Sequence, residues 1–404
     1  MSTTLNSPAL QTLDAPTNVA RLGRFFALEK ELMRVQAARM PALQGWGLKQ
    51  QIGHFLYEDA GHASALLARR AELPGGRREV APLDDAMCVA IEDALFAPDD
   101  YGFCAALYLG FKPLLVQAYR EHLARTTTAS DLPGRQILEQ IIAEEERQIA
   151  WMEGALSVME ASADEKKVAR KTIESIGEAV VRGGGILGTE EPHGNVAMPR
   201  LYHAVTDARR EPRQKVTLDF EAPDAFDDEV KQTVVAHFTM YFREMAAAET
   251  VAVLLWEAPE TMPWEFFAAA ARHFWDEVRH CQAGQQRLEE LGLDIWSVPV
   301  QTGNYNIRAR MPLLERYAFI TQVEEAGSFA YKAEKEALYR AAGDTVSADM
   351  TAYDMADERM HVRYGTKWIP ELQRALGDER TLDELVSDAR ALHTRVMEEL
   401  RASQ

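Results

Sequence analysis

The chain has few cysteines, no long apolar run and fewer basic than acidic residues. Only three cysteines occur in 404 residues, and no two of them form a CxxC pair. This excludes a disulfide scaffold and a ferredoxin-like cysteine set. No apolar run approaches the roughly 18 residues that a membrane span requires. The N-terminus lacks the basic and apolar regions of a signal peptide, so we expect a cytoplasmic protein without membrane insertion.

The charge balance and the glycine pattern exclude further classes of function. The chain carries 44 basic and 63 acidic side chains, a formal net charge of −19, which disfavours binding to nucleic acid or to an anionic membrane. The run of three glycines after Arg182 lacks the GK[ST] ending of a phosphate-binding loop, and no dinucleotide fingerprint is present. The length fits two or three domains or one duplicated unit.

Most of the sequence has the apolar spacing and composition of long amphipathic helices, so we expect an all-α fold. A Pro/Gly-rich stretch interrupts this pattern, and the alternating segment 215–220 predicts one short strand. The expected segments are a disordered tail at 1–20, a helical domain at 22–160, a linker or insert at 161–224, a second helical domain at 225–375, and a C-terminal helix at 376–404.

The two helical blocks are related by an internal repeat. The sequence EDAGH at 58–62 aligns with DEVRH at 276–280, and the same spacing aligns Glu31 with Glu249. Further along, EEERQIAW at 144–151 aligns with DERMHVRY at 357–364. Two similar helical units in one chain account for these matches.

The second block carries a pattern of acids and histidines that predicts a metal site. Residues i and i+3 share one face of a helix, so each ExxH motif directs a carboxylate and an imidazole to one point. Four carboxylates and two imidazoles can hold two divalent ions inside a four-helix bundle, and open mixed ligation favours iron or manganese. The candidate ligands are Glu249 in the expected helix 227–257, Glu277 and His280 in 263–291, Glu324 in 312–341, and Glu358 and His361 in 346–368.

Two of these assignments have alternatives. Glu249 lies in an apolar row, where a carboxylate is costly unless it is paired or bound to metal. The apolar face of 312–341 favours Glu324 over its neighbour Glu325. His273, one turn before Glu277, is either an extra ligand or, as we favour, a histidine at the edge of the core.

Four polar residues are expected to surround the ligands rather than bind metal. Asp276 and Asp357 each precede a ligand glutamate, and each is placed to accept the free ring N–H of a ligand histidine. Arg279 is placed to pair with one of these aspartates, and Asp354 shares the face of Glu358.

The motifs FWDEVRH…RLEELG and DERMHVRYGTKW resemble a known superfamily. The first is similar to the DExRH motif of bacterial diiron monooxygenases, and the block 225–375 resembles the ferritin-like diiron-carboxylate superfamily, with a weaker resemblance over 22–160. The resemblance implies two ferritin-like four-helix bundles in tandem and two iron ions that activate dioxygen. It also implies oxidation of a small organic substrate by hydroxylation, N-oxygenation or oxidative cleavage, with an external electron donor. The acids expected to be catalytic are Glu249, Glu277, Glu324 and Glu358.

The first block departs from the full ligand pattern. Glu31, Asp59, His62 and Glu145 occupy four of the six positions, but Gln148 replaces the last histidine and the window 106–112 contains no acid. We therefore expect a degenerate copy with a structural or interface role, and a homodimer remains open. The competing functions for the chain are ferroxidase or iron handling, and a metal-free helical scaffold.

Overall fold

The computed structural model describes residues 12–189, 200–217 and 219–402. The chain is all-α, as predicted, apart from two short strands in these ranges. Strand β1 (Val216–Thr217) pairs in parallel with β2 (Val300–Gln301), so a strand does form inside the expected segment 215–220. None of the described helices combines the length and the apolar character needed to cross a membrane.

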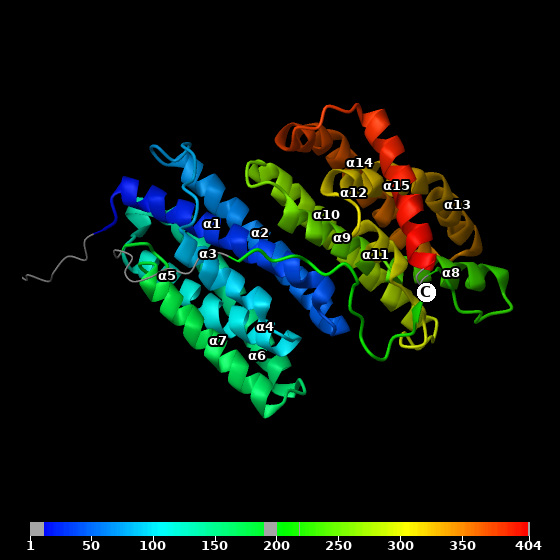
Figure 1. The fold of residues 1–404 in the computed structure, drawn as a ribbon, viewed down its shortest axis with the longest axis horizontal. Helices are drawn as coiled ribbons and strands as arrows, with labels where there is room; N and C mark the ends of the chain where they lie inside the picture. Colours follow the sequence, from blue (N-terminus) through cyan, green and yellow to red (C-terminus); the bar gives the residue numbers. More distant parts are fainter. Residues whose placement is uncertain (1–11, 190–199, 218, 403–404) are drawn as a thin grey trace, which may run out of the picture. The chain divides into compact units, whose positions relative to one another are not determined.

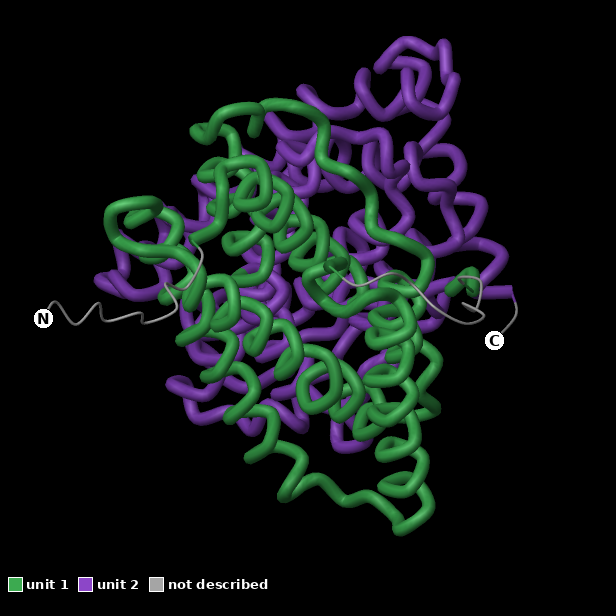
Figure 2. Tube along the Cα trace, turned by 90° about the vertical axis from the view of Figure 1, so that its left-hand side faces the viewer, with its two compact units in different colours: residues 1–35, 58–202 green, residues 36–57, 203–404 purple. Residues whose placement is uncertain are grey.

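The chain forms two compact units, shown in different colours in Figure 2. Unit 1 comprises residues 1–35 and 58–202, and unit 2 comprises 36–57 and 203–404. This division differs from the expected boundaries, because residues 36–57 group with the second half of the chain and much of the expected linker groups with the first. The reason for the second difference is that the linker opens with a long helix, which packs in unit 1.

The first helix of the chain begins earlier than the sequence suggests. The first helix starts inside the expected tail, because the Asp14 side chain accepts a hydrogen bond from the Thr17 backbone N–H at 2.9 Å and caps it. Residues 1–11 of that tail lie outside the described residues. The elements are α1 (Ala15–Arg39), η1 (Met40–Ala42), α2 (Trp46–Glu72), α3 (Asp85–Glu92), η2 (Asp93–Phe96), α4 (Asp100–Cys104), the π-helical η3 (Ala105–Phe111), α5 (Lys112–Ala124), α6 (Thr128–Val158) and α7 (Ala163–Arg182).

In unit 2, two of the expected long helices are continuous and two are interrupted (Figure 1). The expected helix 227–257 breaks at Arg243 and Glu244, and the expected helix 312–341 contains a π-helical segment. The elements are α8 (Glu229–Phe242), α9 (Met245–Glu257), α10 (Trp264–Glu290), α11 (Gly303–Arg308), α12 (Leu313–Phe319), the π-helical η4 (Ile320–Glu325), α13 (Ala326–Ala342), α14 (Thr345–Leu376) and α15 (Leu382–Ala402).

The two continuous helices, α10 and α14, pack against each other and against the interruptions. Helix α10 contacts α8 and α9, and α14 contacts η4 and α13. Two glycines permit these close contacts. A Cβ atom on Gly284 of α10 would clash with the backbone of Phe242, and one on Gly365 of α14 would clash with Thr321. Each glycine lies one turn after an ExxH histidine, so the glycines allow the helix break and the π-helical segment to lie beside the two motifs.

Candidate metal centre

Two groups of histidines and carboxylates lie in the core of unit 2. The ligand atoms within each group all lie within 4.8 Å of one another. The groups are adjacent, because His280 Nδ1 of one lies 3.9 Å from Glu277 Oε2 of the other. We call them the His273 group, formed by His273, Glu277, Glu325 and His361, and the His280 group, formed by Glu244, His280, Asp354 and Glu358.

The two ExxH histidines are held in matching orientations. His361 places Nδ1 3.3 Å from Glu277 and Nε2 3.4 Å from Asp276. His280 places Nδ1 3.3 Å from Asp354 and Nε2 3.3 Å from Asp357. An ionised carboxylate only accepts hydrogen bonds, so each Nε2–H donates to an aspartate and, in the neutral ring, the Nδ1 lone pair faces the carboxylate group. Histidines that bind metal are oriented in this way.

The aspartates that orient the histidines are themselves fixed by arginine. Arg279 Nη2 contacts Asp276 and also lies 2.6 Å from Asp357, so it pairs with both aspartates where the sequence suggested one. Arg272 Nε adds a bond of 2.8 Å to Asp276. Burial raises the pKa of Asp276. Its hydrogen bonds to His361, Arg272 and Arg279 have the larger, opposite effect and hold the pKa well below its ordinary value, so the carboxyl is ionised over the whole physiological range.

The charges in the two groups perturb one another. Burial lowers the pKa of His361, but the nearby carboxylates of Asp276, Glu277 and Glu325 raise it well above its ordinary value. Burial raises the pKa of Glu244 to about 7, against the opposing effects of His280 and Lys332. Without another cation, the cluster therefore retains protons that a divalent ion would displace.

Several atoms of the cluster have no hydrogen-bond partner in the described part of the chain. An unsatisfied buried polar atom costs about 1–3 kcal/mol, so a set of them in one place indicates a bound group. All are oxygen or imidazole nitrogen atoms, which could hold a metal ion. The buried atoms without a partner are Nδ1 of His273, His280 and His361 and Oε2 of Glu244, Glu325 and Glu358.

A lysine already lies in the His280 group. Lys332 of α13 places Nζ 2.9 Å from Asp354 Oδ1 and 2.6 Å from Glu358 Oε1. Burial lowers the pKa of Lys332, but Asp354, Glu358 and Glu244 raise it well above its ordinary value, so it stays charged. In contrast, the described neighbours of the His273 group include no lysine or arginine bonded to its carboxylates. The His280 group therefore already contains the Lys332 ammonium, whereas the His273 group has no such bonded cation among the described residues.

Four of the six predicted ligands lie together, namely Glu277, His280, Glu358 and His361. Glu249 does not join them. It is fully buried, and its carboxylate accepts hydrogen bonds from Lys49 Nζ and, at 2.6 Å and 2.7 Å, from Arg210. Its burial is thus explained by ion pairing. The break after Phe242 changes the helical face, so Glu244 enters the cluster instead.

Glu324 also lies outside both groups, and Glu325 takes its place. Glu324 pairs with Arg308, whereas Glu325 Oε1 lies 2.8 Å from His273 Nε2. The cause is the π-helical η4, whose wider turn shifts the inward face by one residue. His273 and Asp354, expected outside the ligand set, lie within it. His273 lies four residues before Glu277, and Asp354 lies four residues before Glu358. Residues at this spacing share one face of a helix, so the spacing could have identified both as ligands.

Unit 1 contains a related group with a lysine in its centre. The group comprises Glu29, Asp59, His62 and Glu145. Lys112 is fully buried, and its Nζ lies 3.0 Å from both Asp59 oxygens and 2.8 Å from Glu145 Oε1. The spacing that aligns Glu145 with Glu358 aligns Lys112 with Glu325. A lysine thus stands where unit 2 has a candidate ligand.

Glu31 and Gln148 have other roles in unit 1. Glu31 pairs with Arg34 at 2.9 Å and is not part of the group, and Glu29 supplies its carboxylate instead. Gln148 donates a hydrogen bond to Asp59 at 3.1 Å, in the position of the histidine that it replaces. Lys112 and Gln148 thus supply hydrogen bonds to the carboxylates of this group from the chain itself.

A cavity of about 170 Å³ borders both groups of unit 2. Its walls include Glu277, Glu325 and Glu358 from the clusters, with Lys332 beside them. Arg243 and Arg308 lie in the same lining. The cavity gives a small molecule access to the carboxylates.

Comparison with known proteins identifies the family of the chain without a function. Comparison with curated proteins and with solved structures finds no match. The model of one protein family, described as a protein of unknown function (DUF455), matches residues 187–402, which is more than half of the chain and includes both groups of unit 2. The chain therefore belongs to the DUF455 family.

Proposed function

We propose that unit 2 binds two iron ions, or manganese ions, and uses dioxygen to oxidise a small organic substrate. The observation that carries this proposal is the adjacent pair of histidine–carboxylate groups, in which Asp276 and Asp357 orient His361 and His280. The proposal includes a ferritin-like four-helix bundle in each unit, supported by the repeat and by the ExxH motifs on α10 and α14.

Each group would hold one ion, and the bound metal supplies dioxygen activation. The protein contributes the geometry. Asp276 and Asp357 keep the neutral tautomer that presents Nδ1, and Arg279 holds both aspartates in place. Phe266, which is fully buried on α10, packs edge-to-face against Tyr317 and Trp368, so apolar rings exclude water from the neighbouring core.

Lys332 implies an order of metal binding. The His273 group has no bonded lysine or arginine among the described residues, so the first ion would enter there. The second ion must displace the Lys332 ammonium from Asp354 and Glu358. We therefore propose that the His280 group binds its ion more weakly than the His273 group.

The cavity of about 170 Å³ would admit the substrate. Its size suits a molecule of a few non-hydrogen atoms, smaller than most drug-sized ligands. Electrons would come from an external donor, because the sequence has neither a dinucleotide fingerprint nor a cluster of cysteines.

Two adjacent glutamates provide a matched test of the site. The Glu325→Gln variant and the Glu324→Gln variant make the same chemical change one residue apart. Protein purified after expression with iron is assayed for metal by mass spectrometry, and reloaded with Mn²⁺ for electron paramagnetic resonance. We expect wild type and Glu324→Gln to bind about two ions and Glu325→Gln to lose at least one. Loss in Glu324→Gln alone, or metal-free wild type, would contradict the proposal.

The reaction is tested by oxygen consumption. Anaerobically loaded Fe²⁺ protein is mixed with oxygenated buffer, with and without candidate substrates. We expect wild type to consume oxygen faster than free Fe²⁺ and to yield an oxidised organic product, and Glu325→Gln to do neither. Repeated turnover of added Fe²⁺ with no organic product would show ferroxidase activity and overturn the oxygenase proposal.

A further inference from the structure

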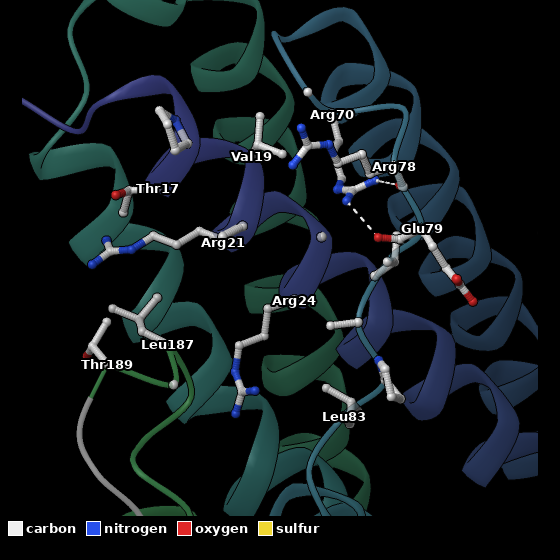
Figure 3. Close-up of a pocket in the computed structure, with 18 of the residues that line it drawn as sticks. Thr17, Val19, Arg21, Arg24, Arg70, Arg78, Glu79, Leu83, Leu187 and Thr189 are labelled. Carbon is white, nitrogen blue, oxygen red and sulfur yellow. Dashed lines mark hydrogen bonds between the residues drawn. The ribbon is translucent and has the colours of Figure 1, made fainter.

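A second cavity, in unit 1, does not bring its charged side chains together, whereas the outer face of α14 in unit 2 does. The cavity has a volume of about 920 Å³, and its walls come from α1, the loop at 74–83 and residues 187–189 (Figure 3). Figure 3 shows Arg21 and Arg70 on different sides of α1, so their charges do not meet at one ligand. On α14, in contrast, charged and apolar side chains form one exposed row.

The exposed residues of α14 follow a heptad repeat. Side chains spaced alternately three and four residues apart lie along one face of a helix, and two helices pair through such faces. Val346, Tyr353 and Met360 are seven residues apart, and their exposed fractions are 44%, 74% and 39%. No other helix in the described ranges has three large exposed apolar side chains at this spacing. We call the exposed row the α14 seam, and it comprises Val346, Asp349, Tyr353, Ala356, Met360, Arg363, Lys367 and Pro370.

The α14 seam lies on the side of the helix opposite to the metal centre. Asp354, Glu358 and His361 of the same helix are buried in the two groups of unit 2. Helix α14 is continuous over Thr345–Leu376, so its inner and outer faces are fixed relative to each other. A partner bound to the seam would therefore hold the helix that carries these candidate ligands, without touching the ligands themselves.

The charged residues of the seam are only weakly bound within their own chain. Arg363 and Lys367 form no ion pair with any described residue. Nη1 of Arg363 lies 3.8 Å from a methionine sulfur, and Nζ of Lys367 lies 4.0 Å from the centre of a tryptophan ring. Asp349 lies 3.2 Å from Arg340, and both side chains are exposed. An exposed pair of this kind contributes little to stability, so Asp349 can exchange its partner.

Two copies of the α14 seam match each other when the helices run antiparallel. A two-fold axis brings the same surface of both copies together, so every facing pair occurs twice. The match requires an axis at the level of Glu358. The facing pairs are then Val346 with Pro370, Asp349 with Lys367, Tyr353 with Arg363, and Ala356 with Met360.

Each facing pair has compatible chemistry. Asp349 and Lys367 carry opposite charges, and the Arg363 guanidinium can stack on the Tyr353 ring. Ala356 is small, so it leaves space for the Met360 side chain of the other copy.

A parallel pairing has no such match. Each residue would face its own counterpart, so Arg363 would meet Arg363 and Lys367 would meet Lys367, and like charges repel. Arg359 flanks the seam, but its guanidinium lies 5.8 Å from the centre of the Phe329 ring, on the side of α13. We infer that α14 pairs antiparallel with α14 of a second copy, so that the chain forms a homodimer. This dimer does not depend on metal binding.

Sedimentation equilibrium of the full chain tests the inference. We expect a mass that rises with concentration to twice that of one chain, over a range of about 1–100 µM. The same result is expected before and after treatment with a chelator, because the seam contains no candidate metal ligand. A monomer at every concentration in this range would overturn the inference.

Exchange of two charges identifies the α14 seam as the interface. Asp349→Lys and Lys367→Asp each place like charges face to face at two symmetric positions, so each should weaken dimerisation at least about tenfold. The double variant restores opposite charges in the antiparallel pair, so its dissociation constant should return to within about threefold of wild type. Both positions are exposed, so circular dichroism should show unchanged helicity.

A matched control makes the same charge change elsewhere in unit 2. Asp383→Lys replaces an exposed aspartate on α15 and should dimerise as wild type does. Wild-type dimerisation in both single variants, or a double variant no better than the single ones, contradicts the antiparallel seam. Equal weakening in Asp383→Lys would show an effect of net charge alone and would also overturn the assignment.

Discussion

The buried lysine of unit 1 gives the sharpest prediction. In the Lys112→Met variant, a side chain of similar length replaces an ammonium that lies 2.8–3.0 Å from all four carboxylate oxygens of Asp59 and Glu145. All three side chains are fully buried. Removing one partner of a buried ion pair costs about 3–5 kcal/mol, because the other charge remains unpaired. At about 2–4 °C per kcal/mol, the melting transition of unit 1 should fall by about 6–20 °C.

The loss should depend on pH in a defined direction. Burial raises the pKa of Asp59 to about 7, and Lys112 opposes this rise. A raised folded-state pKa means that the acid disfavours the fold as pH increases from its unfolded value near 3.8 through 7. Without Lys112 this effect increases. The deficit of Lys112→Met should therefore be larger at pH 7 than at pH 5.

Differential scanning calorimetry at both pH values measures the effect. The control is Lys167→Met, which removes an exposed lysine of α7 and should change stability by less than about 0.5 kcal/mol. If Lys112 replaces a metal ion, added Mn²⁺ should restore part of the lost stability of Lys112→Met and leave wild type unchanged. A loss below about 1 kcal/mol at pH 7 would refute the reasoning that this ammonium holds the carboxylates together.

Three further predictions concern other parts of the chain. The Lys332→Met variant should bind its second metal ion more tightly than wild type, without change in the affinity for the first ion. Titration with Mn²⁺ measures both affinities. An unchanged affinity for the second ion would refute competition between Lys332 and the metal. Gly365→Ala should displace η4 through a clash with Thr321 and reduce bound metal by at least about half, whereas Gly327→Ala, with open space around it, should not. Burial lowers the pKa of His122 to about 4, so stability should fall by up to about 1.4 kcal/mol per pH unit as pH drops from 6.5 towards 4. His122→Gln should flatten this part of the urea-denaturation profile, and an unaltered slope would exclude His122 as its cause.

The ExxH motifs could be located from the sequence because they lie on uninterrupted helices. In α10 and α14 the periodicity holds from end to end, so the spacing of Glu277 and His280 is enough to place both side chains. The all-α class follows from the same periodicity. These features depend only on neighbours along the chain.

The single glutamates could not be placed because their helices are interrupted. The break before Met245 and the π-helical turn before Ala326 each change the inward face, and both depend on packing against glycines of other helices. The ion pairs of Glu249 come from Lys49 and Arg210, far away in the sequence. No local sequence pattern predicts such partners.

The lysines inside the carboxylate groups bear on whether the protein needs a metal ion in order to fold. Carboxylates buried close together in a core repel one another until a metal ion binds, so folding depends on the supply of metal. Lys112 and Lys332 supply positive charge from the chain itself, as soon as it is synthesised. If unit 2 binds metal as proposed, such a chain could complete its fold before any ion binds, so the amount of folded protein would not depend on the metal supply.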